Sequence, residues 1–268
     1  MDYFQVILLG VIQGLTEFFP VSSSGHLILI PHLFNFKDQG LGIHAILHLG
    51  TAIAMVLYFR EDLVRLVRAL FNRNDDPDYH QLAWNIGWAT FPAVVIGMIW
   101  GDLIEQELRN STFVAWNLLF WSFVLLAAQR YSSNQTSTES DISKMTLGQI
   151  LFIGCAQAIA FFPGTSRSSI TIIGGLLTKL SPTASVRFSF LLGAPIIFAA
   201  GAKKTLDYLS EPPLTNGLSI TQLGIGLFVS FTVGYFAIKV LFGIVSRVGL
   251  MPFVIYRVLI ATFILVFF

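Results

Sequence analysis

The sequence has few charged residues. Only 12% of its 268 residues are Asp, Glu, Lys or Arg, whereas soluble domains carry about 25%. Hydrophobic residues make up 54% of the chain, and the mean hydropathy is +0.73. This composition excludes a sizeable soluble domain and predicts a polytopic membrane protein.

Cysteine and concentrated positive charge are also scarce. Cys155 is the single cysteine, which excludes an internal disulfide and a cysteine-ligated metal cluster. The formal net charge is +1, and no basic patch of the kind that binds nucleic acid is present. The N-terminus lacks a basic region followed by a small-residue cleavage site, so we expect no removable signal peptide.

Two polar stretches interrupt apolar sequence, one in each half of the chain. The first, Pro20-Val21-Ser22-Ser23-Ser24-Gly25-His26, separates two apolar arms, each shorter than the roughly 20 residues that span a bilayer. The second, Pro163-Gly164-Thr165-Ser166-Arg167-Ser168-Ser169, follows another apolar arm. We expect two re-entrant hairpins, over residues 4–34 and 145–180, whose polar tips lie in a cavity at membrane depth.

The two stretches are related by a constant separation. Phe18-Phe19-Pro20 and Phe161-Phe162-Pro163 are 143 residues apart, as are Ser23 and Ser166. The same separation carries the Leu-Gly pair at position 49 onto the one at position 192. A constant offset indicates an internal duplication, as in membrane proteins built from repeats.

Six further apolar segments predict membrane-spanning helices, at residues 43–59, 82–103, 112–129, 184–202, 220–242 and 251–268. Residues 61–70 have the spacing of an amphipathic surface helix. The polar residues 131–144 indicate a linker between a first repeat, 1–130, and a second, 145–268. The predicted fold is all-α, with six transmembrane helices and two re-entrant helical hairpins. Three spans per repeat is an odd number, which makes the repeat an inverted-topology one.

Basic residues predict the orientation. If the N-terminus is outside, the inner loops hold eight Lys and Arg residues and the outer loops hold four. This excess favours both termini on the outer face of the membrane.

Arg167 is the sharpest chemical signal in the sequence. An arginine at mid-membrane costs about 2.5 to 3.5 kcal/mol and needs a partner or an anionic ligand. A helix is expected to begin just after Pro163-Gly164, which directs its N-terminal N–H groups to the same point. Arginine, hydroxyls and a helix N-terminus together are typical of phosphate binding. The hydroxyls that we expect to take part are those of Ser22, Ser166, Ser168 and Thr171. The alternative is an arginine that is paired with Glu17 for structure only.

Glu17 and Gln13 are expected to form a cation site. They are four residues apart and share one helix face. Their oxygens could hold a divalent cation, with phosphate oxygens and water completing its shell. The alternative is that Glu17 only balances the charge of Arg167.

The first tip also holds candidate nucleophiles. His26 is a candidate general base or direct nucleophile. Ser23 is a candidate nucleophile, a phosphate donor or a helix cap. Attack by water remains a third alternative. His44 and His48 have a metal-ligand spacing, but no glutamate follows His44, and we interpret them as interfacial or structural.

The two tip motifs together resemble those of the undecaprenyl-diphosphate phosphatase family linked to bacitracin resistance. The resemblance covers Gln13 to His26, Pro163 to Thr171 and Pro252 to Arg257, and extends over the whole chain. It implies an enzyme of the bacterial inner membrane that converts undecaprenyl diphosphate to the monophosphate and phosphate on the periplasmic side. It also implies dependence on Mg²⁺ or Ca²⁺. The matching functional positions are Glu17, Ser23, His26, Ser166, Arg167 and Thr171.

Other functions are compatible with parts of this pattern. Acid-phosphatase-type lipid phosphatases share a Ser-Gly-His and a Ser-Arg motif, but Ile173 stands where their histidine should fall. An inverted repeat with broken hairpins is also a transporter architecture, so a transporter or flippase of an anionic lipid or phosphate is the alternative class. The expected partners are the lipid substrate and membrane lipids, without nucleic acid. A homodimer is compatible with the sequence.

Overall fold

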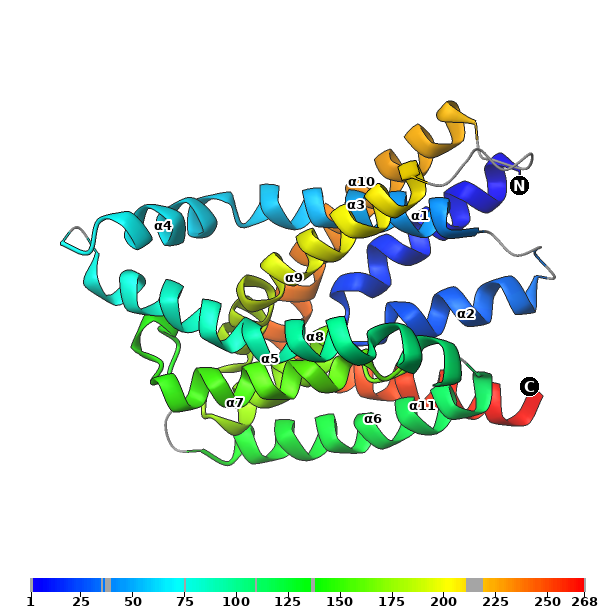
Figure 1. Cartoon of the computed structure of the whole chain (residues 1–268). Coiled ribbons are helices and arrows are strands. Elements are labelled where there is room, and N and C mark those ends of the chain that lie inside the picture. The colour runs from blue at the N-terminus through cyan, green and yellow to red at the C-terminus, as the bar shows by residue number, and fades with distance from the viewer. Residues whose placement is uncertain are drawn as a thin grey trace.

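The fold is described from a computed structural model that covers residues 2–34, 36, 40–74, 76–108, 110–135, 138–210 and 219–267. Within these ranges the chain forms helices and no strands (Figure 1). The helices are α1 (Tyr3–Phe18), α2 (Ser23–Leu33), α3 (Gly40–Tyr58), α4 (Arg60–Phe71), α5 (Pro77–Leu108), α6 (Ser111–Ser133), η1 (Ile142–Lys144), α7 (Leu147–Ala158), η2 (Ile159–Phe161), α8 (Arg167–Leu177), α9 (Pro182–Ser210), α10 (Ile220–Val248) and α11 (Met251–Phe267). The predicted all-α class is confirmed.

Four helices in the described ranges are long and apolar enough to cross a membrane: Pro77–Gly101, Ser111–Ser133, Pro182–Lys203 and Ile220–Val248. They correspond to four of the six predicted spans. The predicted span at 43–59 is one arm of a pair, Ile43–Tyr58 and Arg60–Phe71, which is bent by 76° and counts as a fifth span only if both arms belong to it. The sixth corresponds to α11, which is 17 residues long in the described part. The chain is therefore a multi-pass membrane protein.

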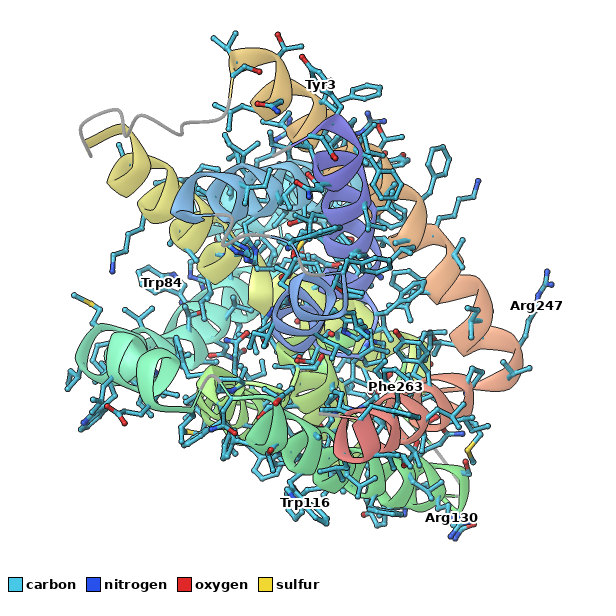
Figure 2. The ribbon with its side chains drawn as sticks, turned by 90° about the vertical axis from the view of Figure 1, so that its right-hand side faces the viewer. Tyr3, Trp84, Trp116, Arg130, Arg247 and Phe263 are labelled. Atoms are coloured by element: carbon cyan, nitrogen blue, oxygen red, sulfur yellow. The ribbon has the colours of Figure 1, made fainter. Side chains whose placement is uncertain are left out.

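The outer surface of the helix bundle carries large aromatic side chains. Trp84 and Trp116 point away from the bundle in Figure 2, and more than half of each side chain is exposed. Aromatic rings on the outside of apolar helices suit contact with lipid and with its interface.

Two helix–break–helix units reach the centre of the molecule from opposite ends (Figure 1). In the first, α1 and α2 flank a break at residues 19–22; in the second, α7 with η2 and α8 flank a break at residues 162–166. Pro20 and Pro163 contribute to these breaks because proline has no N–H to continue a helix. The first break touches the start of α8, because Ser168 Oγ donates to the Phe19 carbonyl at 3.2 Å.

Two features of the units, their first caps and the ends of their breaks, match at a separation one residue larger than predicted. Asp2 and Thr146 begin α1 and α7 with the same capping box. Ser22 and Ser166 end the breaks with positive φ angles of 74° and 70°. Both pairs are 144 residues apart. The predicted equivalence of Ser23 with Ser166 is therefore wrong by one residue.

An extra residue in the second break explains the shift at the ends of the breaks, because the arms that precede them end at Phe18 and Phe161, which are 143 residues apart. Gly164 has a φ of 93°, which glycine adopts without the steric cost that other residues meet. A Cβ at this position would lie 2.7 Å from the Val114 carbonyl oxygen. Because the second break contains this extra residue, Ser23 is the structural counterpart of Arg167. Each of them begins the second helix of its unit.

Small residues allow the broken units to pack closely on long helices. α1 packs on α10 through Gly10 and Gly14, and α7 packs on α5 through Gly154. A Cβ added at Gly14 would lie 2.8 Å from Val233. Such small-residue contacts let helix backbones approach in membrane proteins. They position the ends of α1 and α7 at the centre of the bundle.

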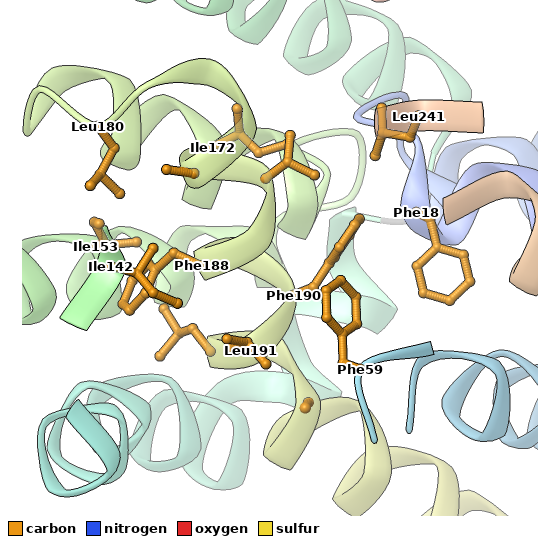
Figure 3. Close-up of a cluster of buried hydrophobic side chains, with 14 of the residues drawn as sticks. Phe18, Phe59, Ile142, Ile153, Ile172, Leu180, Phe188, Phe190, Leu191 and Leu241 are labelled. Carbon is orange, nitrogen blue, oxygen red and sulfur yellow. The ribbon is translucent and has the colours of Figure 1, made fainter. Parts of the chain in front are cut away.

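A cluster of aromatic side chains packs against the C-terminal end of α1. Phe18, Phe59 and Phe190 lie together in Figure 3, with ring centroids 5.6 Å apart for Phe18–Phe190 and 5.7 Å for Phe59–Phe190. Each such pair contributes about 0.5–1.5 kcal/mol beyond its area burial. This packing fixes the last turn of α1, which carries Glu17.

Candidate active site

An arginine–glutamate pair joins the two broken units. Glu17, in the last turn of α1, accepts a hydrogen bond from Arg167, the first residue of α8, with Nη2 and Oε1 3.1 Å apart. The side chains are 9% and 14% exposed, respectively. Gly193 on α9 makes room for the guanidinium, since a Cβ there would collide with Nη1. The pairing of Glu17 with Arg167, given above as the structural alternative to phosphate binding, is present in the structure.

The second oxygen of Glu17 binds two more predicted site residues. Ser23 Oγ donates to Oε2 at 2.9 Å, and Gln13 Nε2 donates to it at 3.0 Å. His48 lies beside them, with Nδ1 3.0 Å from Gln13 Nε2 and 3.8 Å from Glu17 Oε2. His48, interpreted above as interfacial or structural, is thus in direct contact with the site.

His26 occupies a separate position. Its Nδ1 donates to the Ser22 carbonyl at 2.7 Å, and its Nε2 lies 2.6 Å from the Tyr256 hydroxyl. A carbonyl only accepts, so Nδ1 carries the proton, and the neutral ring accepts from Tyr256 at Nε2. Within the described residues no hydrogen bond or ion pair joins His26 to Glu17 or Arg167. The structure therefore divides the predicted catalytic residues into two groups.

The predicted phosphate-binding hydroxyls have partners within the protein. Ser166 caps α8 by accepting from the Ser169 N–H at 3.3 Å, and Ser22 Oγ accepts from the Gly25 N–H at 3.4 Å. Thr171 Oγ1 donates to the Arg167 carbonyl at 2.8 Å and also contacts Ser189 on α9. In this arrangement the hydroxyls shape the two tips around Arg167, and their role as phosphate ligands stays a prediction.

Arg257 on α11 holds both breaks together. It is fully buried, and its guanidinium donates to the carbonyls of Pro20 in the first break and of Gly164 and Thr165 in the second. Ser122 Oγ on α6 and the Leu118 carbonyl complete its partners. A buried cation is costly unless it is well bonded, and here carbonyl oxygens bind it from both units.

A cavity of about 160 Å³ opens beside the ion pair. Its polar wall is formed by Glu17, His48, Gln157 and Arg167. Three buried polar groups at or beside this wall have no hydrogen-bond partner in the described residues: Arg167 Nη1, Gln13 Oε1 and the Gln157 amide. The rest of the wall is apolar, with Ala93, Ala160, Phe161, Ile196, Ile197 and Ala200. The cavity thus offers unpaired polar groups next to an apolar surface.

The predicted cation site would use the side-chain oxygens of Gln13 and Glu17. Gln13 Oε1 is buried without a protein partner and lies on the same helix face as Glu17. Both are oxygen donors of the kind that Mg²⁺ and Ca²⁺ prefer. The described residues contain no group of three or more His, Cys, Asp or Glu side chains that could enclose an ion. The donors therefore fit a divalent cation in type, provided that substrate oxygens and water complete the shell.

Fold and site together define a class: a multi-pass membrane protein with a buried arginine–glutamate pair between two broken helical units. The comparison with known families agrees. The chain belongs to the family of the bacitracin resistance protein BacA, whose model matches residues 6–263.

Relatives in this family extend over the full chain. The undecaprenyl-diphosphatase 2 of Stutzerimonas stutzeri is 40% identical over 277 residues, covering 100% of this chain and 99% of that protein. The undecaprenyl-diphosphatase of Campylobacter concisus is 36% identical and covers 100% of both chains. That of Saccharophagus degradans is 39% identical over 97% of this chain and 96% of its own.

Sequence reasoning missed several residues at the two tips. Arg257 was noted only as part of a resemblance, although a lone arginine in the apolar segment 251–268 is the same signal that singled out Arg167. Tyr256 and Gln157 had no local signal, because each meets the site through packing of distant segments.

Proposed function

We propose that this protein hydrolyses undecaprenyl diphosphate to undecaprenyl phosphate and inorganic phosphate. The observation that carries the proposal is the buried arginine Arg167, whose Nη1 is unpaired within the described residues beside an apolar-walled cavity. Full-length relatives named undecaprenyl-diphosphatase support the same substrate. The product is the lipid carrier that cell-wall synthesis reuses, which accounts for a link with bacitracin resistance.

The site separates the charge of the substrate from its chain. Arg167 neutralises the phosphoryl oxygens, and the first N–H groups of α8 add to its field because the helix begins at this residue. The apolar wall, which includes Phe161 and Ile197, receives the first isoprene units while the rest of the chain stays in lipid. This division suits a lipid with a diphosphate head.

The geometry favours Ser23 as the attacking group. Its Oγ donates to Glu17 Oε2 at 2.9 Å, so the carboxylate can take the proton as Oγ attacks the terminal phosphorus. The bond from phosphorus to the bridging oxygen then breaks, and undecaprenyl phosphate leaves. Its second pKa is about 6, so it departs without a general acid. Water hydrolyses the resulting phosphoserine. Direct attack by His26 would require its Nε2 to leave Tyr256.

The first prediction tests both function and nucleophile. Purified protein in detergent, where no gradient exists, should release phosphate from substrate that is labelled in its terminal phosphate. Acid quenching during turnover should trap label on the protein, lost in base but retained in acid, because a phosphoserine is acid-stable. Label that survives base and is lost in acid would move the role to His26. No release at all would leave the transporter alternative.

A divalent cation is proposed beside this site. Glu17 and Gln13 would hold it with substrate oxygens, and when bound it would withdraw charge from the diphosphate. We expect excess chelator to stop phosphate release. Glu17→Gln should lower kcat, because it removes the base for Ser23, and should raise the Mg²⁺ or Ca²⁺ concentration needed for half of the remaining activity. Full activity in chelator would exclude the ion from the reaction.

The proposed setting is the bacterial inner membrane, with the site open to the periplasm and the two broken units acting as re-entrant hairpins of a six-span inverted repeat. The paired packing of α1 on α10 and of α7 on α5 supports the inversion, as does the location of both termini at one end of the molecule (Figure 1).

Cysteine labelling tests this orientation. In a Cys155→Ala background, a cysteine at Phe34 should react from outside the cell, and one at Asp141 only after permeabilisation. Phe34 is chosen because it is a described residue close to Lys37, a basic residue of the predicted outer loops. Lys37 itself and Arg109, another basic residue of these loops, lie outside the described residues. Reaction of both cysteines from one face would contradict the inverted repeat. A homodimer remains a further proposal, which the mass of the protein in detergent would test.

A further inference from the structure

Gln157 differs from the amide that supports the second tip, because neither end of its side-chain amide has a partner in the described residues. It lies on α7 and is 2% exposed, and neither its Nε2 nor its Oε1 has a hydrogen-bond partner among the described residues. By contrast, Asn117 Nδ2 donates to the Pro163 carbonyl and to Thr165 Oγ1, both at 2.8 Å. The amide that supports the second tip is therefore bonded, whereas the side chain of Gln157 makes no hydrogen bond to the residues that the structure describes.

The position of Gln157 indicates what its amide can bind. It lines the same cavity as Arg167 and Glu17, and Arg167 Nη1 is a second unpaired donor there. A buried amide without a partner destabilises the folded state, because its lost hydration is not replaced. Two unpaired donors on one cavity wall suit a ligand that carries several acceptor oxygens.

We propose that Gln157 is a substrate-binding residue whose Nε2 donates to an oxygen of the diphosphate head that Arg167 neutralises. This inference rests on the proposed function and adds a residue to the site. An amide is suited to this position because it donates without adding charge, whereas a carboxylate would repel both the diphosphate and Glu17. The residue would therefore contribute to affinity rather than to the chemical step.

Three variants of the purified full-length protein test the proposal. Gln157→Leu removes the donor and keeps a similar volume, and Gln157→Glu replaces the donor by a negative charge. Asn85→Leu is the matched control: Asn85 is 7% exposed, its Nδ2 also lacks a partner in the described residues, and it does not line the cavity. Melting temperature, KM, kcat and inhibition by inorganic phosphate are measured for each.

We expect Gln157→Leu to keep or raise the melting temperature, because it removes an unpaired amide from the interior. Its KM and the inhibition constant for phosphate should rise about tenfold, with a smaller change in kcat, since a hydrogen bond to a charged ligand is lost. Gln157→Glu should weaken phosphate binding more strongly. Asn85→Leu should match the stability change and leave KM unaltered.

Two outcomes would overturn the inference. One is an unchanged KM and unchanged phosphate inhibition in Gln157→Leu. The other is a fall in its melting temperature that Asn85→Leu does not share, which would assign Gln157 to the fold. Both outcomes are interpreted only if the wild-type protein releases phosphate in the same assay. If the wild-type protein releases no phosphate, the proposed function fails instead, and the two failures are therefore distinguishable.

Discussion

Arg167→Ala is expected to lower phosphate release about 1,000-fold or more. Arginines that stabilise a transferring phosphoryl group are worth about 10³–10⁵ in rate, and Arg167 is the cation that lines the cavity in the described residues. Arg167→Lys should recover only part of the activity, because an ammonium lacks the planar fork that can bind Glu17 and a phosphate together. The measurement is kcat and KM of the purified variants in detergent.

The control for this prediction must separate chemistry from folding. Removing Arg167 leaves Glu17 buried without its cation, which costs about 3–5 kcal/mol in a buried pair. An Arg167→Ala, Glu17→Gln double variant removes both charges and should fold while remaining inactive. Arg187→Ala serves as a matched arginine, since Arg187 pairs with Asp62 on α4 and does not line the cavity. Near-normal turnover in the double variant would refute phosphate binding by Arg167.

Arg257→Met is expected to impair both stability and turnover. It leaves the buried carbonyls of Pro20, Gly164 and Thr165 without a donor, and each unsatisfied buried group costs about 1–3 kcal/mol. We therefore expect a loss of at least about 3 kcal/mol in the free energy of unfolding. The two breaks would also lose their common anchor, which would displace Ser23 from Arg167.

A second variant distinguishes positioning from mere stability. Arg257→Lys keeps the charge and should fold, but an ammonium has fewer donors for the same carbonyls. Its kcat should fall about 100-fold at temperatures where it remains folded, because a displacement of about 1 Å in a reacting group can cost that much. Ser122→Ala removes one partner of Arg257 and should retain most activity. Full turnover in Arg257→Lys and Arg257→Met would contradict the positioning role.

The class of the protein and the place of its site could be predicted from composition and local sequence. Apolar composition predicts a membrane protein, because backbone groups in lipid must be satisfied within helices. Polar residues inside apolar stretches located both breaks. The pairing of Glu17 with Arg167 was also predictable, since a buried arginine needs an anion. These are local or compositional signals, which a single chain carries without reference to its packing.

Which residues meet at the site depends on the packing of the helices. A one-residue expansion at Gly164 shifts the register between the repeats, so that Ser23 rather than Ser24 matches Arg167. Tyr256 reaches His26 across 230 positions of sequence. Helical spacing predicts neighbours only three or four residues apart, whereas these contacts depend on how whole helices pack. For the same reason the unpaired amide of Gln157 becomes visible only when the cavity around it has formed.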